Sequence, residues 1–193
     1  MSVEYWGTNI QEADIGRTSA AGAAVIYGNN TYKAMRVIGD SYNLFYSVWC
    51  TNEHELYDLK VSNPALEQLV WLHLRYNSLQ PLQNDPYQMR NLFIYHQSKL
   101  LGRDVKQVIS RLDALLLVLK SCKGSQCTMP WQVLHPDKKV TSLSEALNPK
   151  YDAFYAAQPY ISFSACELGY IQESEGPQEG YAYRRNGDWS NWA

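Results

Sequence analysis

The sequence lacks a long hydrophobic run and carries little net charge. Its longest apolar stretch is residues 114–119, far short of the roughly 20 residues that a membrane-spanning helix needs. The formal net charge is -2, from 17 basic and 19 acidic residues, with no long run of like charges. A nucleic-acid or anionic-membrane surface requires a strong basic patch. We therefore expect neither nucleic acid nor a membrane among its partners.

The motifs of common catalytic and metal sites are missing as well. The four histidines are scattered, with no H-x3-H pair, and neither a G-x-S-x-G elbow nor a glycine-rich phosphate loop occurs. Glu55 and Asp58 stand three apart on a predicted strand, so their side chains should point to opposite faces. We therefore assign no catalytic residue, no cofactor-binding residue and no metal ligand. Residues 1–5 have neither a basic nor an apolar leader region, so no secretory signal is expected there.

Cysteine is scarce, with four residues in the chain. Cys122 and Cys127 enclose a short stretch that contains Gly124, which suits a small disulfide loop after a helix, or two reduced thiols at the helix end. Metal binding is the weakest reading, because this spacing supplies too few ligands. Cys50 and Cys166 could also pair, but their spacing does not define a geometry.

What the sequence does contain is a strong pattern of strands followed by one long helix. Residues 32–38 and 42–50 are rich in aromatic and β-branched residues, and Gly39-Asp40-Ser41 between them is typical of a hairpin turn. A third strand is predicted over residues 54–59. One side of the second strand is apolar, formed by Tyr42, Leu44, Tyr46 and Val48. We expect these strands to form one antiparallel sheet.

Residues 104–121 have the spacing of an amphipathic helix, with Asp104 as its N-cap. We expect this helix to lie on the apolar face of the sheet through Val108, Leu112, Leu115 and Leu119, which gives an α+β fold. Shorter elements are predicted after Asp85-Pro86 and over residues 142–147 and 151–157 as helices, and over 160–163 as a strand. Residues 173–193 are rich in Gly, Pro, Gln and Arg, which predicts a mobile tail.

Two phrases carry a family resemblance: HELYDL at residues 54–59 and NDPYQMRNL at residues 84–92. Together they resemble a strand, turn and short helix near the end of sulfatases. Other stretches extend the similarity: residues 3–7, 29–34, 42–51 and 111–116. The chain thus resembles the C-terminal portion of a fungal-type arylsulfatase. This resemblance implies the C-terminal subdomain of the alkaline-phosphatase-like sulfatase fold, covering residues 1–60 and 84–172.

The resemblance also implies what the chain would need from elsewhere. Sulfatases hydrolyse sulfuric esters with a formylglycine, made from the cysteine of a Cys-x-Pro-x-Arg motif, and with a bound calcium. None of the four cysteines has proline two positions on. We therefore expect a fragment that is inactive alone, whose partner is a missing N-terminal catalytic domain. Family members are exported, so Asn29 in Asn29-Asn30-Thr31 is a predicted glycosylation site of a secreted glycoprotein.

Residues 61–83 interrupt the two sulfatase-like phrases. Joining Lys60 to Asn84 restores the phrase without a gap, and the edges of the segment can be encoded by the boundaries of a spliceosomal intron. Our hypothesis is that the segment is a translated intron; the alternative is a genuine surface loop.

Two other functions are open. The 15 tyrosines and six tryptophans could give a non-catalytic carbohydrate- or protein-binding module an aromatic-rich face. The chain could also be an incomplete gene product that does not fold alone.

Overall fold

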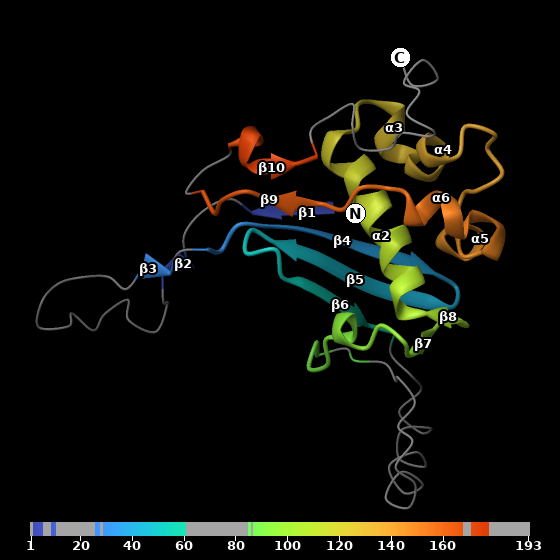
Figure 1. Ribbon diagram of the computed structural model, residues 1–193, viewed down its shortest axis with the longest axis horizontal. Helices are drawn as coiled ribbons and strands as arrows, with labels where there is room; N and C mark the ends of the chain where they lie inside the picture. Colours follow the sequence, from blue (N-terminus) through green and yellow to red (C-terminus); the bar gives the residue numbers. More distant parts are fainter. Residues whose placement is uncertain are drawn as a thin grey trace, which may run out of the picture.

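The computed structural model describes residues 2–5, 9–10, 26–27, 29–60, 85, 87–167 and 171–177. Its centre is a four-stranded antiparallel sheet of order β1-β4-β5-β6 (Figure 1). The strands are β1 (Ser2–Tyr5), β4 (Tyr32–Gly39), β5 (Tyr42–Trp49) and β6 (His54–Asp58). The three strands predicted from the sequence are confirmed, and β1 adds a fourth at the edge of β4.

The turn between β4 and β5 depends on glycine. Gly39 pairs with Tyr42 in the hairpin register. A Cβ atom added at Gly39 would lie 2.4 Å from a ring carbon of Tyr42. No side chain fits there unless the ring moves, so the hairpin signal in the sequence has a steric cause.

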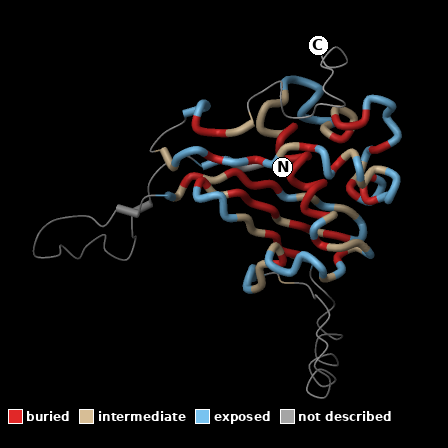
Figure 2. Tube along the Cα trace, in the orientation of Figure 1, coloured by how far each residue is buried: buried red, intermediate tan, exposed pale blue. Residues whose placement is uncertain are grey.

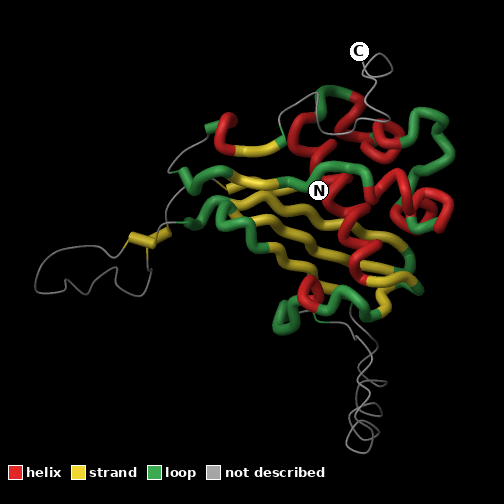
Figure 3. Tube along the Cα trace, viewed as in Figure 1, coloured by secondary structure: helices red, strands yellow, loops and turns green. Residues whose placement is uncertain are grey.

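Helix α2 (Val105–Ser121) lies across one face of this sheet (Figures 1 and 3). Its first turn is held by the side chain of Gln107, whose Oε1 accepts the Asp104 N–H at 3.2 Å. The buried side of β5 meets the helix, and both run through the buried centre of the molecule (Figure 2). The predicted helix is confirmed and lies on the sheet. Of the four residues predicted to make that contact, Val108, Leu112 and Leu115 are buried, but Leu119 is only partly buried. The fold is mixed α and β with a small antiparallel sheet.

The remaining elements are short. The helices are α3 (Ser125–Thr128), α4 (Pro130–Leu134), α5 (Leu143–Ala146) and α6 (Asp152–Ala156), with 3-10 turns η2 (Leu92–Ile94), η3 (Pro149–Tyr151) and η4 (Gln172–Ser174). Three strand pairs complete the list: β2 (Asn9–Ile10) with β3 (Ile26–Tyr27), β7 (Lys99–Leu100) with β8 (Arg103–Asp104), and β9 (Ser162–Phe163) with β10 (Glu175–Gly176). Helices α4 and α6 pack against α2. The described helices include none that is long and apolar enough to cross a membrane.

The helix predicted to start at Asp85-Pro86 is wrong for the described residues. Residues 87–91 form no helix, and the first helical turn is η2. The reason is that Asn91 is held by the edge of β6: its Oδ1 accepts the Leu56 N–H at 3.0 Å, and its Nδ2 donates to the His54 carbonyl at 3.0 Å. One side chain therefore replaces a neighbouring strand at this point.

The predicted mobile tail begins too early at residue 173. Residues 173–177 belong to the fold, because β10 pairs with β9 and Glu175 is buried. The Glu175 carboxylate lies 3.1 Å from Lys33 Nζ and 3.1 Å from Lys120 Nζ. A polar composition predicted disorder, whereas ion pairing inside the protein fixes this segment. Residues 178–193 lie outside the described residues.

The proposed insertion, residues 61–83, also lies outside the described residues. The described chain stops at Lys60 and resumes at Asp85, whose N–H donates to the Asp58 carbonyl at 2.5 Å. The described residues that flank the segment, Asp58 and Asp85, are therefore close together. The intron hypothesis stays a prediction, which the sequence of the mature transcript would test.

The packing of α2 predicts a large effect of truncating Leu112, which is fully buried. We expect Leu112→Ala to lower the free energy of unfolding by about 2–5 kcal/mol, because it removes buried methyl groups and leaves a cavity. Denaturant unfolding of the two proteins measures the difference. Lys106→Ala, an exposed change on the same helix, should stay within about 0.5 kcal/mol of the parent. Equal effects of both substitutions would contradict the packing.

Candidate functional site

A chain of hydrogen bonds crosses the interface between α2 and the sheet. The Tyr46 hydroxyl donates to Asp113 Oδ1 at 2.8 Å and lies 2.8 Å from His54 Nδ1. The second carboxylate oxygen of Asp113 accepts the Ile161 N–H at 2.9 Å. The His54 ring stacks on Phe93, with centroids 4.8 Å apart. Three polar side chains thus join α2, β5 and β6.

Burial shifts the pKa values of the residues in this hydrogen-bond network. It raises the pKa of Asp113 to about 7, although the hydrogen bonds from Tyr46 and Ile161 oppose the shift. Burial also raises the pKa of Tyr46 and lowers the pKa of His54. Near neutral pH a proton can therefore reside on Asp113 while His54 is neutral.

The direction of these hydrogen bonds depends on whether Asp113 carries the proton. With Asp113 ionised, Tyr46 donates to it and can accept from a protonated Nδ1 of His54. With Asp113 protonated, its hydroxyl can donate to Tyr46, and Tyr46 can donate to His54 Nδ1. Asp113 is 1% exposed, so no substrate reaches it in this arrangement. This network of hydrogen bonds has a structural role.

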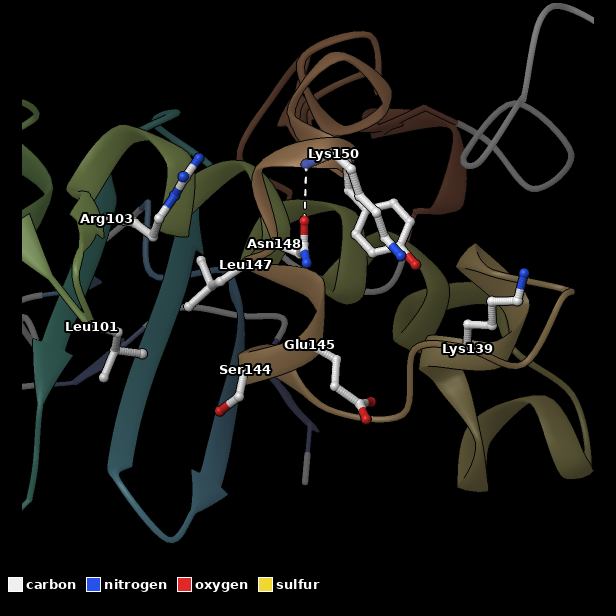
Figure 4. A pocket seen from close by; sticks show the side chains of 9 residues that line it. Leu101, Arg103, Lys139, Ser144, Glu145, Leu147, Asn148 and Lys150 are labelled. Atoms are coloured by element: carbon white, nitrogen blue, oxygen red, sulfur yellow. Dashed lines mark hydrogen bonds between the residues drawn. The ribbon is translucent and has the colours of Figure 1, made fainter.

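A cavity of about 380 Å³ opens beside β8, α5 and η3 (Figure 4). Its wall carries three cationic side chains, Arg103, Lys139 and Lys150, and one carboxylate, Glu145. Five further residues line it: Leu101, Ser144, Leu147, Asn148 and Tyr151.

Arg103 of this wall and the buried Arg111 share one carboxylate, that of Asp152. Arg103 Nη2 lies 2.5 and 2.7 Å from the Asp152 oxygens, and Arg111 Nη2 lies 2.5 Å from Asp152 Oδ1. Partial burial tends to raise the pKa of Asp152, but the hydrogen bonds from both arginines outweigh it and lower the pKa. Arg111 is itself buried and donates through Nε to the Ala146 carbonyl at 3.1 Å. The group therefore carries an excess of positive charge.

The sheet face opposite α2 carries a row of aromatic rings. Strand register places Tyr5, Tyr32 and Trp49 side by side on β1, β4 and β5. The Tyr5 and Tyr32 centroids are 5.9 Å apart, and those of Tyr32 and Trp49 are 4.8 Å apart. Tyr5 is 37% exposed and the other two rings are half-buried. These three rings form an aromatic face of the kind that the sequence analysis considered.

The cysteines are all paired. Cys122 and Cys127 form a disulfide with a Cα–Cα distance of 5.2 Å, and Cys50 and Cys166 form a second one at 5.0 Å. The described residues contain no cluster of three or more His, Cys, Asp or Glu side chains that could hold a metal. Asn29, the predicted glycosylation site, is exposed in the segment before β4.

Arg111 and Asp113 are charged residues of α2, yet both are 1% exposed. Asp113 faces the sheet, where Tyr46 of β5 donates to it, whereas Arg111 faces the short helices and bonds to Asp152 of α6. The sequence signal for this burial is weak. It consists of two oppositely charged residues within a helix followed by several short helical segments.

The raised pKa of Asp113 predicts a pH dependence of stability. The folded pKa is about 7, against an ordinary value of 3.8. Between these values the folded protein holds a proton that the unfolded chain has released. The free energy of unfolding should therefore fall as pH rises from about 4 to 7, by up to about 1.4 kcal/mol per pH unit.

Asp113→Asn should remove this contribution. The amide can mimic the protonated acid, since Nδ2 can donate to Tyr46 while Oδ1 accepts the Ile161 N–H. Urea unfolding at several pH values gives the slopes. The exposed change Asp137→Asn is the control and should not remove the Asp113 contribution. A parent and an Asp113→Asn variant with the same slope would refute the assigned protonation.

Comparison with known proteins gives the family. No family model matches the sequence, and no solved structure matches it. Three curated proteins do. "Sulfatase ppz1" from Metarhizium majus is 41% identical over 149 residues, which cover 77% of this chain and 28% of that protein. Arylsulfatases from Volvox carteri and Chlamydomonas reinhardtii are each 35% identical, over 142 and 140 residues, covering 72% of this chain and 17% of each relative.

The chain therefore spans between 17% and 28% of the length of these relatives. The sulfatase resemblance expected from residues 54–59 and 84–92 is confirmed over most of the sequence. The chain is a homologue of the sulfatases. It matches a part of an arylsulfatase, and this match is consistent with the C-terminal portion of the enzyme.

Proposed function

We propose that this chain is the C-terminal portion of an arylsulfatase-like sulfuric ester hydrolase and has no sulfatase activity alone. The observation that carries this is the state of its cysteines. All four are held in disulfides, and none lies in a Cys-x-Pro-x-Arg motif. A formylglycine nucleophile therefore has no precursor among these residues.

The other parts of the reaction would come from outside the chain. Calcium prefers six to eight oxygen ligands, and the described residues offer no acidic cluster of that kind. We assign both calcium and formylglycine to an N-terminal catalytic domain that is this chain's partner. The sheet and α2 would form the C-terminal subdomain of the sulfatase fold and support that domain.

Exposed apolar side chains near η2 are consistent with such a partner. Tyr87 is 84% exposed, Met89 85% and Ile94 66%. Large apolar residues gathered on a surface mark contact sites for other protein. The aromatic sheet face formed by Tyr5, Tyr32 and Trp49 is a second surface that the partner could cover.

The two disulfides also support a secreted enzyme, because disulfides persist in oxidising compartments. Asn29 is exposed and would carry a glycan on that route. This part of the proposal concerns localisation alone and does not affect the assignment of the chain to a sulfatase.

The second candidate function is a non-catalytic carbohydrate-binding module. It is favoured by the row of Tyr5, Tyr32 and Trp49, since aromatic faces stack on the apolar faces of sugar rings. The two functions differ in what they require. The module works alone, whereas the sulfatase portion needs the rest of the enzyme.

A chimera tests the proposal. In the Metarhizium majus sulfatase, the segment aligned with this chain is replaced by this chain, and aryl sulfate hydrolysis is assayed with calcium. We expect the chimera to be active and the isolated chain to be inactive. A chimera carrying Leu112→Ala should lose activity or yield in proportion to the loss of stability. Hydrolysis by the isolated chain that EDTA abolishes, or a folded chimera without activity, would contradict the proposal.

A further inference from the structure

The two disulfides of the chain lie in different surroundings. Cys50 follows β5 directly and is 4% exposed, and its bond to Cys166 joins residues 116 positions apart. Cys127 is exposed, and its bond to Cys122 spans only five positions. This second disulfide lies beside α3, at the outer end of α2 (Figure 1). One disulfide therefore belongs to the core and the other to the surface.

The Cys50–Cys166 bond is built into the hydrogen bonding around the sheet. The Cys50 N–H donates to the Thr31 carbonyl at 2.9 Å, and Thr31 Oγ1 donates to the Glu167 carbonyl at 3.0 Å. Cys166 is thus fixed next to the residue that precedes β4. A cross-link over a long loop also restricts the unfolded chain more than one over a short loop. Loss of this bond should therefore destabilise the whole fold.

The loop closed by Cys122 and Cys127 contributes little to the core. Residues 123–129 are all exposed, and α3 contains no buried residue. The turn has backbone contacts of its own, since the Cys127 N–H donates to the Gly124 carbonyl at 3.2 Å. Opening this disulfide exposes almost no apolar surface and leaves contacts that can bring the two cysteines together again.

The two sulfur atoms of this disulfide are not equivalent. Cys127 is exposed, whereas Cys122 is half-buried and its sulfur lies 3.5 Å from the Leu119 carbonyl oxygen. A thiol formed at Cys122 would therefore have a hydrogen-bond acceptor in place. Lys123 directly follows Cys122, and residues 114–136 contain no acidic residue. A neighbouring cation favours the thiolate form of a cysteine, which makes it a better leaving group.

We propose that Cys122–Cys127 is a reversible thiol-exchange site for an external dithiol, whereas Cys50–Cys166 is a permanent structural cross-link. A thiolate of the dithiol attacks Cys127 Sγ and forms a mixed disulfide with it. The bond between the two cysteine sulfurs breaks, and its electron pair leaves on Cys122 Sγ, which takes a proton from water.

The second step completes the exchange. The other thiolate of the dithiol attacks the dithiol's own sulfur in the mixed disulfide and releases Cys127, which also takes a proton. Two electrons have then passed to the protein, and the dithiol has become a disulfide. The reverse reaction restores the Cys122–Cys127 bond.

Such a site gives the protein two forms that share one core. In the reduced form α3 is no longer held by a covalent bond, so it can open locally while α2 and the sheet keep their contacts. Exposed disulfides are more readily reduced than buried ones. In an oxidising compartment the bonded form would be the resting state, and a dithiol reductant would convert it.

Differential reduction of the full chain tests the site. The native protein is incubated with increasing dithiothreitol without denaturant, free thiols are blocked with N-ethylmaleimide, and mass spectrometry of peptides gives the labelled fraction of each cysteine. We expect labelling of Cys122 and Cys127 at a dithiothreitol concentration about tenfold or more below that for Cys50 and Cys166. Removal of dithiothreitol in air should restore the bond.

The thermal midpoint separates a local change from unfolding. The selectively reduced protein should have a midpoint closer to that of the oxidised protein than the double variant Cys50→Ser, Cys166→Ser has. Reduction of both disulfides at the same concentration, or of Cys50–Cys166 first, would overturn the proposal. Global unfolding on reduction of Cys122–Cys127 alone would overturn it as well.

Single variants identify the attacked sulfur. Cys122→Ser leaves the exposed Cys127 thiol, and Cys127→Ser leaves the half-buried Cys122 thiol. The two variants are matched because both lack the same bond. With oxidised glutathione, the Cys127 thiol should form its mixed disulfide faster than the Cys122 thiol does. Equal or reversed rates would contradict the role given to Cys127, and the reduction of the parent chain tests the site without any variant.

Discussion

The constraint that organises this protein is the burial of helix α2 on both of its sides. Residues 108–118 of the helix are all buried, against the sheet on one side and against α4 and α6 on the other. The charged residues within this stretch, Arg111 and Asp113, cannot stay in water. Each must instead find a partner within the protein, since an unpaired buried charge costs several kcal/mol.

The polar contacts of the fold follow from that requirement. Asp113 bonds to Tyr46 and to the Ile161 amide, and this links the helix to β5 and to the chain that leads into β9. Arg111 bonds to Asp152 and stacks at 4.5 Å over the Tyr155 ring, which fixes α6. Near the other end, burial lowers the pKa of Lys120 while Glu175 opposes the shift. Glu175 thereby attaches β10 to the same helix.

The parts of this fold that the sequence could predict are those with a regular hydrophobic period. Alternation over Tyr42–Trp49 and the helical spacing over Val105–Ser121 are strong patterns, and both elements are found where they were expected. Short elements have no such signal. The single turns α3 and α4 and the two-residue strands β9 and β10 depend on tertiary contacts. Asn91 replaces a strand through its side chain, which no periodicity could reveal.

The cavity was equally beyond prediction from sequence. Arg103, Lys139 and Lys150 are spread along the chain and meet only because β8, the segment before α5 and η3 converge. What the sequence did supply is the family, through two phrases at residues 54–59 and 84–92. Those phrases describe β6 and the segment that holds its edge, and in the structure Asn91 joins the two. A family signature is therefore also a structural unit here.

Hydrogen exchange on the isolated chain tests most directly whether α2 is buried by this chain's own residues. Amides of α2 and β5 should exchange only by global unfolding, with one common free energy, because both belong to one core. The account predicts that Leu112→Ala lowers the protection of both elements equally. Exchange of the α2 amides within seconds, while β5 stays protected, would show that the helix needs another domain to dock and would contradict the account.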